Sequence, residues 1–248
     1  MAPTIDGATI AEEEREAGRP PRVSGFDLAL RTAPWLICAS AFFLGIAMLP
    51  LLPDMVASHW DASGNVNGYM PKLWGAFLLP LILLVLVALL EAIPLIDPLK
   101  ANIESFRVEY DGLVVAMSLF MFTLYAWTIA WSFGFHIDSN VILPIGMGLL
   151  FIYVGFVLTR AKRNYMVGIR TPWTLASDEV WDRTHHLGGV LFAVAGVVTM
   201  LGAFASQFAM WFLLLPLLVV TVWTTAYSYV LFRRLEREGK LPSTPQPM

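Results

Sequence analysis

The sequence has few charged residues. Asp, Glu, Lys and Arg together make up 14% of its 248 residues, whereas soluble globular chains carry about 25%. Hydrophobic residues make up 57% of the chain, and the mean hydropathy is +0.66. So little charge cannot cover the surface of a soluble domain of this size, and the composition therefore predicts an integral membrane protein.

Cysteine is nearly absent as well. Cys38 is the single cysteine, which excludes an intramolecular disulfide, a CxxC redox pair and a zinc site built from several cysteines. The sequence also lacks a HExxH zinc motif, a GxSxG nucleophile elbow and a phosphate-binding glycine loop. These absences favour a binding protein over an enzyme, and we expect no cofactor.

Long apolar runs are what the chain has instead. A helix needs about 20 residues to cross the hydrocarbon core of a bilayer. Six runs reach that length, at residues 33–52, 74–96, 112–135, 141–159, 187–206 and 210–232. They are continuous and do not alternate like the strands of a membrane β-barrel. The sequence therefore predicts an all-α integral membrane protein, a bundle of six transmembrane helices.

Shorter patterns add detail to this bundle. Asp97 and Pro98 predict the start of a short amphipathic connector between the second and third spans. Apolar residues recur along one face of that segment: Leu99, Ile103, Phe106 and Tyr110. Small residues in the fourth and fifth spans predict close contacts between helices. They are Gly148 and Gly155, then Gly189, Ala193 and Gly196.

The basic residues are distributed unevenly between the two sides of the predicted bundle. Fifteen of the sixteen Lys and Arg residues, all except Lys72, fall in the terminal segments and in the second and fourth loops. Loops rich in Lys and Arg stay in the cytoplasm. We therefore expect a multi-pass protein of the cell membrane with both termini cytoplasmic, loop 160–186 inside and loop 53–73 outside.

The same patterns divide the chain into four parts. Residues 1–30 are acidic near their start and poor in apolar residues, which is typical of a disordered tail. Residues 31–138 then form an N-terminal three-helix half that includes loop 53–73. Residues 139–235 form a C-terminal three-helix half that includes loop 160–186, and residues 236–248 form a second cytoplasmic tail.

Loop 53–73 contains the string "SHWDASGNVNGYMPK". Gly64 and Gly68 suit turns that need positive φ, and Trp60 suits the headgroup layer of a membrane. His59 and Asp61 flank Trp60 and are able to contact a ligand. These five residues are our candidates for a ligand-binding surface on the outer face.

A metal site is an alternative interpretation of the same loop. A metal ion needs three or four ligands, so His59 and Asp61 would require help from Asp54, His136 or Asp138. The sequence alone does not show that these side chains converge, and we favour a structural or ligand-contacting loop.

Loop 160–186 contains the string "NYMVGIRTPWTLASDEVWDRTHHLG". It combines polar, glycine and aromatic residues more densely than anchoring in a headgroup layer requires, and Arg170 offers a rigid fork of donors for a carboxylate or phosphate. The candidate partner-binding residues here are Asn164, Gly168, Arg170, Thr171, Pro172, Trp173, Thr174, Trp181 and His185.

This string closely resembles the signature of the SdpI family of bacterial and archaeal membrane proteins. The upstream strings "LPDMVASHWDASGNVNGYMPK" and "PLIDPLKANIESFRVEY" resemble the uncharacterised membrane domain that commonly precedes it. The resemblance covers roughly residues 49 to 200. It implies a membrane immunity and sensing protein that meets a secreted antimicrobial peptide on the outer face. It also implies possible sequestration of an ArsR-type transcriptional repressor on the cytoplasmic face, without direct binding of nucleic acid.

A membrane-embedded enzyme, with or without a metal, or a small transporter is the alternative function. It would use His59 and Asp61 together with Glu91, which is the only acid well inside an apolar run. Acidic residues within a membrane span commonly have a functional role. Against transport, the predicted spans hold few of the charged residues that an ion or proton path requires.

Overall fold

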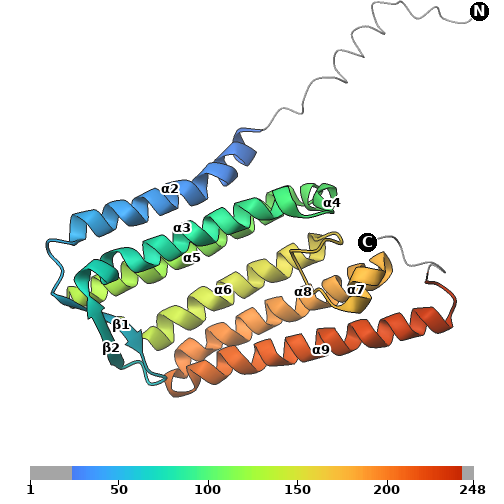
Figure 1. Cartoon of the computed structure of the whole chain (residues 1–248). Helices are drawn as coiled ribbons and strands as arrows, with labels where there is room; N and C mark the ends of the chain where they lie inside the picture. Colours follow the sequence, from blue (N-terminus) through green and yellow to red (C-terminus); the bar gives the residue numbers. More distant parts are fainter. Residues whose placement is uncertain (1–23, 242–248) are drawn as a thin grey trace, which may run out of the picture.

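The computed structural model describes residues 24–241. Residues 1–23 of the predicted tail 1–30 and residues 242–248 of the predicted tail 236–248 lie outside this range. Six long helices run side by side (Figure 1). They are α2 (Gly25–Met48), α3 (Lys72–Ile96), α5 (Arg107–Ser132), α6 (Ser139–Arg160), α8 (Asp178–Leu201) and α9 (Ala209–Arg237). All six are long and apolar enough to cross a membrane. The prediction of a six-helix membrane bundle is confirmed.

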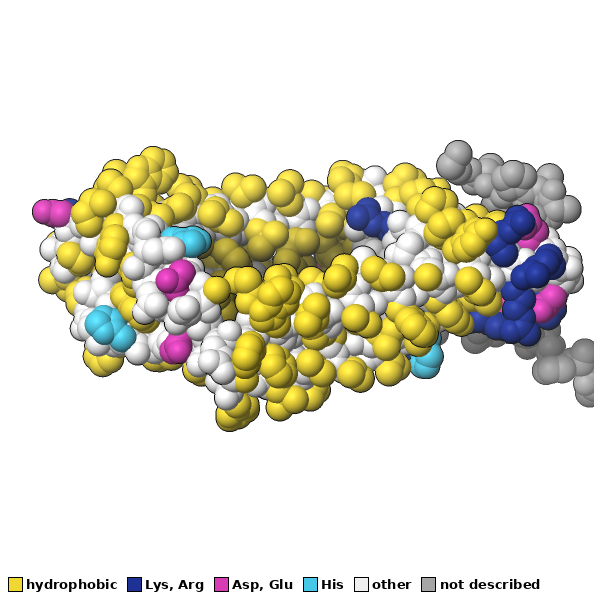
Figure 2. Space-filling model, turned by 90° about the horizontal axis from the view of Figure 1, so that it is seen from below, with side chains coloured by type: hydrophobic (Ala, Val, Ile, Leu, Met, Phe, Trp, Pro, Cys, Tyr) yellow, Lys and Arg dark blue, Asp and Glu magenta, His cyan; other side chains and the backbone are white. Residues whose placement is uncertain are grey.

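The two ends of the bundle differ in structure and charge. One end carries a two-stranded antiparallel hairpin of β1 (Met55–Trp60) and β2 (Val66–Pro71). The sequence did not predict these strands. We call this end of the bundle the hairpin end. The start of α2, the end of α9 and the short helices α4 (Lys100–Glu104) and α7 (Pro172–Ala176) lie at the opposite end (Figure 1). Lys and Arg side chains gather there (Figure 2), and we call it the basic end.

The helices pack as two groups of three. Helices α2, α3 and α5 contact one another and form the first half, and helices α6, α8 and α9 form the second. Helix α5 packs against α6 and joins the halves. Two 3₁₀ turns, η1 (Gly202–Phe204) and η2 (Ser206–Phe208), connect α8 to α9.

Helix α2 starts earlier than the sequence suggested. We expected a disordered tail up to residue 30, but the helix begins at Gly25. Ser24 and Asp27 form a capping box, in which the Ser24 side chain accepts from the Asp27 backbone and the Asp27 side chain accepts from the Ser24 backbone. This reciprocal cap satisfies two backbone donors and lets the helix begin before its apolar run.

The glycines of the second half lie where two backbones nearly touch, as predicted. A Cβ added at Gly155 would lie 2.5 Å from the Gly189 carbonyl oxygen, and one added at Gly148 would lie 2.5 Å from the Gly196 carbonyl oxygen. Only glycine allows this separation, and the close approach increases van der Waals contact in a solvent that is itself apolar.

Candidate functional site

The tip of the hairpin is an aspartate-based turn. The Asp61 side chain accepts from the backbone N–H groups of Ser63, at 2.8 Å, and Asn65, at 3.0 Å. Gly64 has φ +84° and completes the turn in the left-handed region that favours glycine. Asp61 therefore braces the loop, and one of its carboxylate oxygens is already occupied.

His59 is exposed on β1 and is held across the hairpin. Its Nδ1 is hydrogen-bonded to Oδ1 of Asn67 on β2. The expectation of a positive-φ turn at Gly68 is wrong, because Gly68 lies within β2. Gly68 pairs with His59 in the sheet register, and a Cβ on Gly68 would lie 2.9 Å from the His59 Cβ. Glycine at position 68 therefore makes room for the imidazole, whose other ring nitrogen has no hydrogen bond to the described residues.

Trp60 points from the hairpin onto the end of α5. Its ring centroid lies 4.3 Å from that of Trp127 and 5.4 Å from that of Trp131. His136 then lies against Trp131 at 4.6 Å. We call these four rings the aromatic cluster. The buried Trp60 Nε1 has no hydrogen-bond partner among the described residues, so the cluster keeps one unused donor.

The metal-site alternative finds no support in this geometry. Within residues 24–241, no three His, Cys, Asp or Glu side chains lie close enough to hold a metal ion. His136 is in the aromatic cluster, Asp138 accepts from the Asn140 backbone at the start of α6, and Asp54 pairs with Lys72 at 2.9 Å. The five candidate ligands have separate structural partners and do not converge.

At the basic end, Asn164 is fully buried and closes its own turn. Its Nδ2 donates to the carbonyl oxygens of Lys162, at 2.8 Å, and Val167, at 3.0 Å. Its Oδ1 accepts from the backbone N–H groups of Met166 and Val167. All the hydrogen-bonding capacity of the amide is used inside loop 160–186, so Asn164 shapes the loop and has no donor left for a partner.

His185 and Trp181 form a buried pair of stacked rings beneath the same loop. Their rings stack at 3.9 Å, and both side chains are at most 1% exposed. His185 Nε2 accepts from the Ile169 backbone N–H at 2.9 Å, and Nδ1 lies 2.9 Å from the Trp181 carbonyl oxygen. This pairing is consistent with a neutral imidazole protonated on Nδ1.

Gly168 lies against these two rings at a turn of the chain. It has φ +118°, and an added Cβ would collide with His185 Nε2. Both the backbone conformation and the space therefore require glycine at this position.

Thr171 and Thr174 cap helix α7 and tie it to α9. Their side chains and backbones form a capping box, and Thr171 Oγ1 lies 3.0 Å from Ser228 Oγ. Pro172 occupies the first turn of α7, and Trp173 packs against Tyr229 at 4.9 Å. This set of contacts positions the exposed surface of the loop.

The nine candidates in loop 160–186 therefore have unequal roles. Asn164, Thr171, Thr174, Trp181 and His185 are buried. Gly168, Arg170 and Pro172 are exposed, and Trp173 is half-buried. Arg170 Nη1 donates to the Tyr165 carbonyl oxygen at 2.5 Å. The remaining donors of Arg170 are thus available at the surface.

Two residues that the sequence did not identify as site residues connect the halves here. The Asp97 carboxylate, 2% exposed, accepts from the backbone N–H groups of Leu99, at 2.6 Å, and Tyr165, at 2.9 Å. Asn102 on α4 donates to the Arg163 carbonyl oxygen at 2.7 Å. The N-cap pattern at Asp97 was visible in the sequence, but its partner 68 residues away was not.

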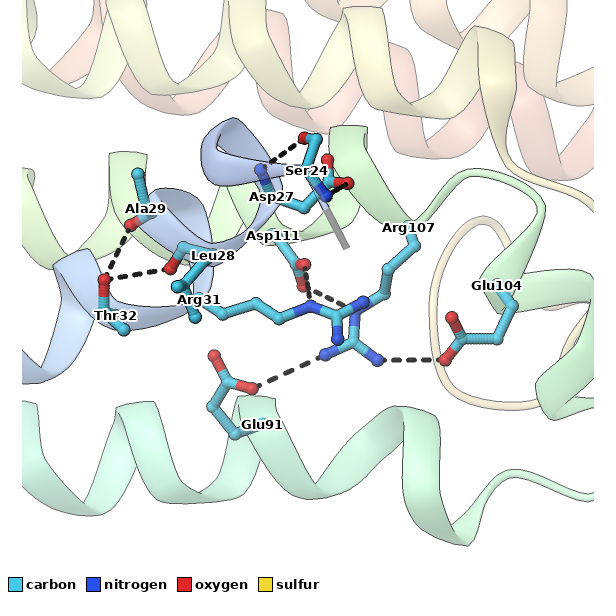
Figure 3. Close-up of polar contacts among 10 residues, drawn as sticks. All are labelled: Ser24, Asp27, Leu28, Ala29, Arg31, Thr32, Glu91, Glu104, Arg107 and Asp111. Carbon is cyan, nitrogen blue, oxygen red and sulfur yellow. Dashed lines mark hydrogen bonds and ion pairs between the residues drawn. The ribbon is translucent and has the colours of Figure 1, made fainter. Parts of the chain in front are cut away.

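A charged cluster lies inside the first half near the basic end (Figure 3). Asp111, whose side chain is 3% exposed, pairs with Arg107 at 2.6 Å and with Arg31 at 3.2 Å. Arg107 also pairs with Glu104 at 3.1 Å and with Glu91 at 3.6 Å. Glu91 is therefore part of a network that joins α2, α3 and α5.

This placement separates the residues of the enzyme or transporter alternative. His59 lies in the hairpin, which leads into α3 at Lys72, whereas Glu91 lies 19 residues further along that helix. At 1.5 Å rise per residue this is a separation of about 28 Å along the helix axis. Glu91 cannot act in one site with His59 and Asp61.

Comparison with known proteins agrees with this architecture. Residues 160–228 match the SdpI/YfhL protein family, and residues 36–84 match a domain of unknown function, DUF1648. The chain is 24% identical over 202 residues to the immunity protein SdpI of Bacillus subtilis (strain 168), covering 81% of this chain and 94% of that protein. No solved structure matches the chain. The resemblance to the SdpI family is confirmed.

Proposed function

We propose that this protein is an SdpI-like immunity protein that protects a cell against a membrane-active antimicrobial peptide. The observation that carries the proposal is the alignment with immunity protein SdpI along 94% of that protein's length. An alignment that covers 81% of this chain spans its central part, which contains the hairpin and loop 160–186.

The proposed orientation places the hairpin end outside the cell and the basic end in the cytoplasm. Its support is the charge distribution, because all Lys and Arg residues except Lys72 belong to the basic-end segments and the tails. The hairpin would then be the surface that a secreted peptide reaches first.

The hairpin offers chemistry suited to an amphipathic peptide. The aromatic cluster provides apolar area, and the exposed His59 provides a ring nitrogen for a hydrogen bond. Tryptophan combines an apolar ring with a polar N–H, which is suitable for contacts at a membrane surface. We propose that peptide binds across His59 and this cluster.

The basic end would carry the signal to a cytoplasmic partner such as an ArsR-type repressor. Arg170 and Pro172 are exposed on a loop that the buried residues hold in one shape. A preformed loop loses little conformational entropy on binding, which favours association.

Orientation is tested with single cysteines in a chain carrying Cys38→Ala. Asn65→Cys at the tip of the hairpin and Ala176→Cys at the end of α7 are both exposed positions. An impermeant thiol reagent added to intact cells should label the first and not the second. Labelling of Ala176→Cys from outside would overturn the orientation.

Protection is tested by expressing the chain in sensitive bacteria challenged with a panel of purified amphipathic antimicrobial peptides. Wild type should raise the inhibitory concentration of at least one peptide several-fold. His59→Ala and Asp61→Ala should lower this protection at unchanged membrane abundance, and Ser63→Ala, exposed in the same turn, should retain it. Wild type without effect on any peptide would contradict the proposal.

The partner surface is tested with Arg170. Arg170→Lys keeps the charge but loses the rigid fork of donors. It should weaken co-purification of a cytoplasmic repressor encoded by a neighbouring gene, while the amount of the membrane protein stays normal. If Arg170→Lys and Arg170→Ala both co-purify as much repressor as wild type does, Arg170 is not part of the proposed partner surface.

A further inference from the structure

A groove at the basic end has no role in the proposed immunity function. It has a volume of about 650 Å³ and lies between the end of α6 and the first turns of α8, with Tyr227 of α9 also contributing. We call it the basic-end groove. It opens on the outside of the bundle, because Thr159, His186 and Val190 on its wall are exposed.

The lining of this groove changes along its length. Lys162, Arg183 and His186 lie towards the end of the bundle, together with the carboxylate of Asp182, so that the two cations outnumber the one acid of the lining. Leu158, Leu187 and Val190 continue from there into the membrane-spanning parts of α6 and α8. A cationic head followed by an apolar wall matches a molecule with an anionic group and a hydrocarbon chain.

The cations of the groove are paired with neighbouring carboxylates, but these pairs lie at the surface. Lys162 is 3.6 Å from Asp182, which is a loose pair, and both side chains are more than half exposed. Arg183 pairs with Glu179 through Nη2 at 2.6 Å. Exposed pairs of this kind contribute little and exchange readily. The His186 ring makes no hydrogen bond with the described residues.

We propose that the basic-end groove binds one anionic phospholipid, with the phosphate at Lys162, Arg183 and His186. One acyl chain then lies along Leu158, Leu187 and Val190. A phosphate accepts charge-assisted hydrogen bonds from Arg and Lys, which are roughly twice as strong as neutral ones. Basic pockets beside membrane helices on the cytoplasmic side recognise anionic headgroups in this way.

The experiment measures thermal unfolding of the purified full chain in a neutral detergent. Dioleoylphosphatidylglycerol should raise the Tm by a few degrees because a ligand bound only to the folded state stabilises it. The double variant Lys162→Gln/Arg183→Gln should need about tenfold more of this lipid for the same rise. The pair Arg233→Gln/Arg237→Gln removes two charges from α9 outside the groove and should respond like wild type.

A second variant tests the acyl-chain part without changing charge. Val190 is 51% exposed, so Val190→Trp is compatible with folding and should fill the apolar wall and reduce the lipid response. An equal response to dioleoylphosphatidylcholine would overturn the proposal. An equal loss of the lipid-induced Tm rise in Arg233→Gln/Arg237→Gln, or an unchanged rise in the groove variants, would also overturn it. The same Tm rise with inorganic phosphate alone would identify a free-phosphate site and overturn the lipid proposal.

Discussion

The two halves of the bundle face the same membrane but differ in the contacts that predominate between their helices. In the first half, polar side chains bridge the helices: Asp111 pairs with two arginines, and Tyr125 donates to the Ala76 carbonyl oxygen at 2.8 Å. In the second half, the absence of side chains at Gly148 and Gly155 brings the backbones of α6 and α8 into contact. Because lipid gives apolar side chains no hydrophobic reason to associate, membrane helices depend on such polar contacts and on close backbone packing.

This difference predicts which substitutions damage each half. A buried ionic network fails when one member is removed, since its partners keep their charges. A glycine contact fails when any side chain is added, whatever its polarity. The following predictions test this contrast, beginning with the largest expected effect.

Removal of the Asp111 carboxylate should have the largest effect. Asp111→Ala leaves Arg107 and Arg31 without their shared partner, and breaking a buried pair costs about 3–5 kcal/mol. We expect the lower part of this range, because the Arg31 side chain is 40% exposed. Thermal or denaturant unfolding of the purified protein measures the change.

The matched control for Asp111 is Glu104. It pairs with the same Arg107 but is 53% exposed, so Glu104→Ala should cost at most about 1 kcal/mol. Equal losses in the two variants would show that burial of Asp111 does not determine the strength of the network.

Addition of a side chain at Gly155 should have the next largest effect. A Cβ there would meet the Gly189 carbonyl oxygen, which is backbone and cannot rotate away. We expect Gly155→Leu to cost about 1–3 kcal/mol and to lower the yield of monodisperse protein in size-exclusion chromatography. Val194 of α8 is 55% exposed, and the control variant Val194→Leu should behave like wild type. A stable Gly155→Leu variant would mean that the second half does not depend on backbone contact.

The connection between the halves should be weaker than either half. Asp97→Ala removes the acceptor of the Tyr165 backbone N–H, and a buried unsatisfied donor costs about 1–3 kcal/mol. We expect faster hydrogen exchange in residues 163–170 with little change in α2. Glu179→Ala removes a 40% exposed carboxylate that pairs with Arg183, outside the measured segment, and serves as control. Unchanged exchange in Asp97→Ala would show that the halves are not joined through this carboxylate.

The smallest effect is expected for a carboxylate in water. Arg234 and Lys240 lower the pKa of Glu238 to about 2, chiefly by hydrogen bonds from Lys240 and then Arg234. Because the folded pKa is depressed, any contribution to stability is present above the ordinary carboxylate pKa and is lost as the pH falls towards 2. Glu238 forms its ion pairs at the surface, where such pairs contribute little, so Glu238→Gln should leave the Tm unchanged at pH 7. A clear fall in Tm would contradict the view that burial separates this pair from Asp111.

Much of the fold could be predicted from the sequence. The six spans followed from hydrocarbon thickness, and the glycine contact between α6 and α8 followed from residue spacing on a helix. The hairpin was missed because its polar string reads equally well as a turn. Its strands form where Trp60 docks onto Trp127 of α5, and that contact depends on helix packing.

The sequence predicted which residues make up the candidate site, but it did not predict the role of each residue. In loop 160–186, the density of Asn, Gly, Thr and His indicated a specialised loop, but most of these side chains bond within the loop and beneath it. Sequence patterns identify residues that are unusual for a membrane interface. They do not tell whether a polar group satisfies a partner protein or its own backbone.

Local chemistry determined the membrane class, the six helices, the uneven charge and the short caps from the sequence alone, because each depends on residues that are neighbours in the chain or on one helix face. Only the tertiary structure decided that Asp97 meets Tyr165, that Arg31 and Arg107 share Asp111, and that His59 and Glu91 lie at opposite ends. These pairings join residues tens of positions apart, and their geometry is set by how the helices pack.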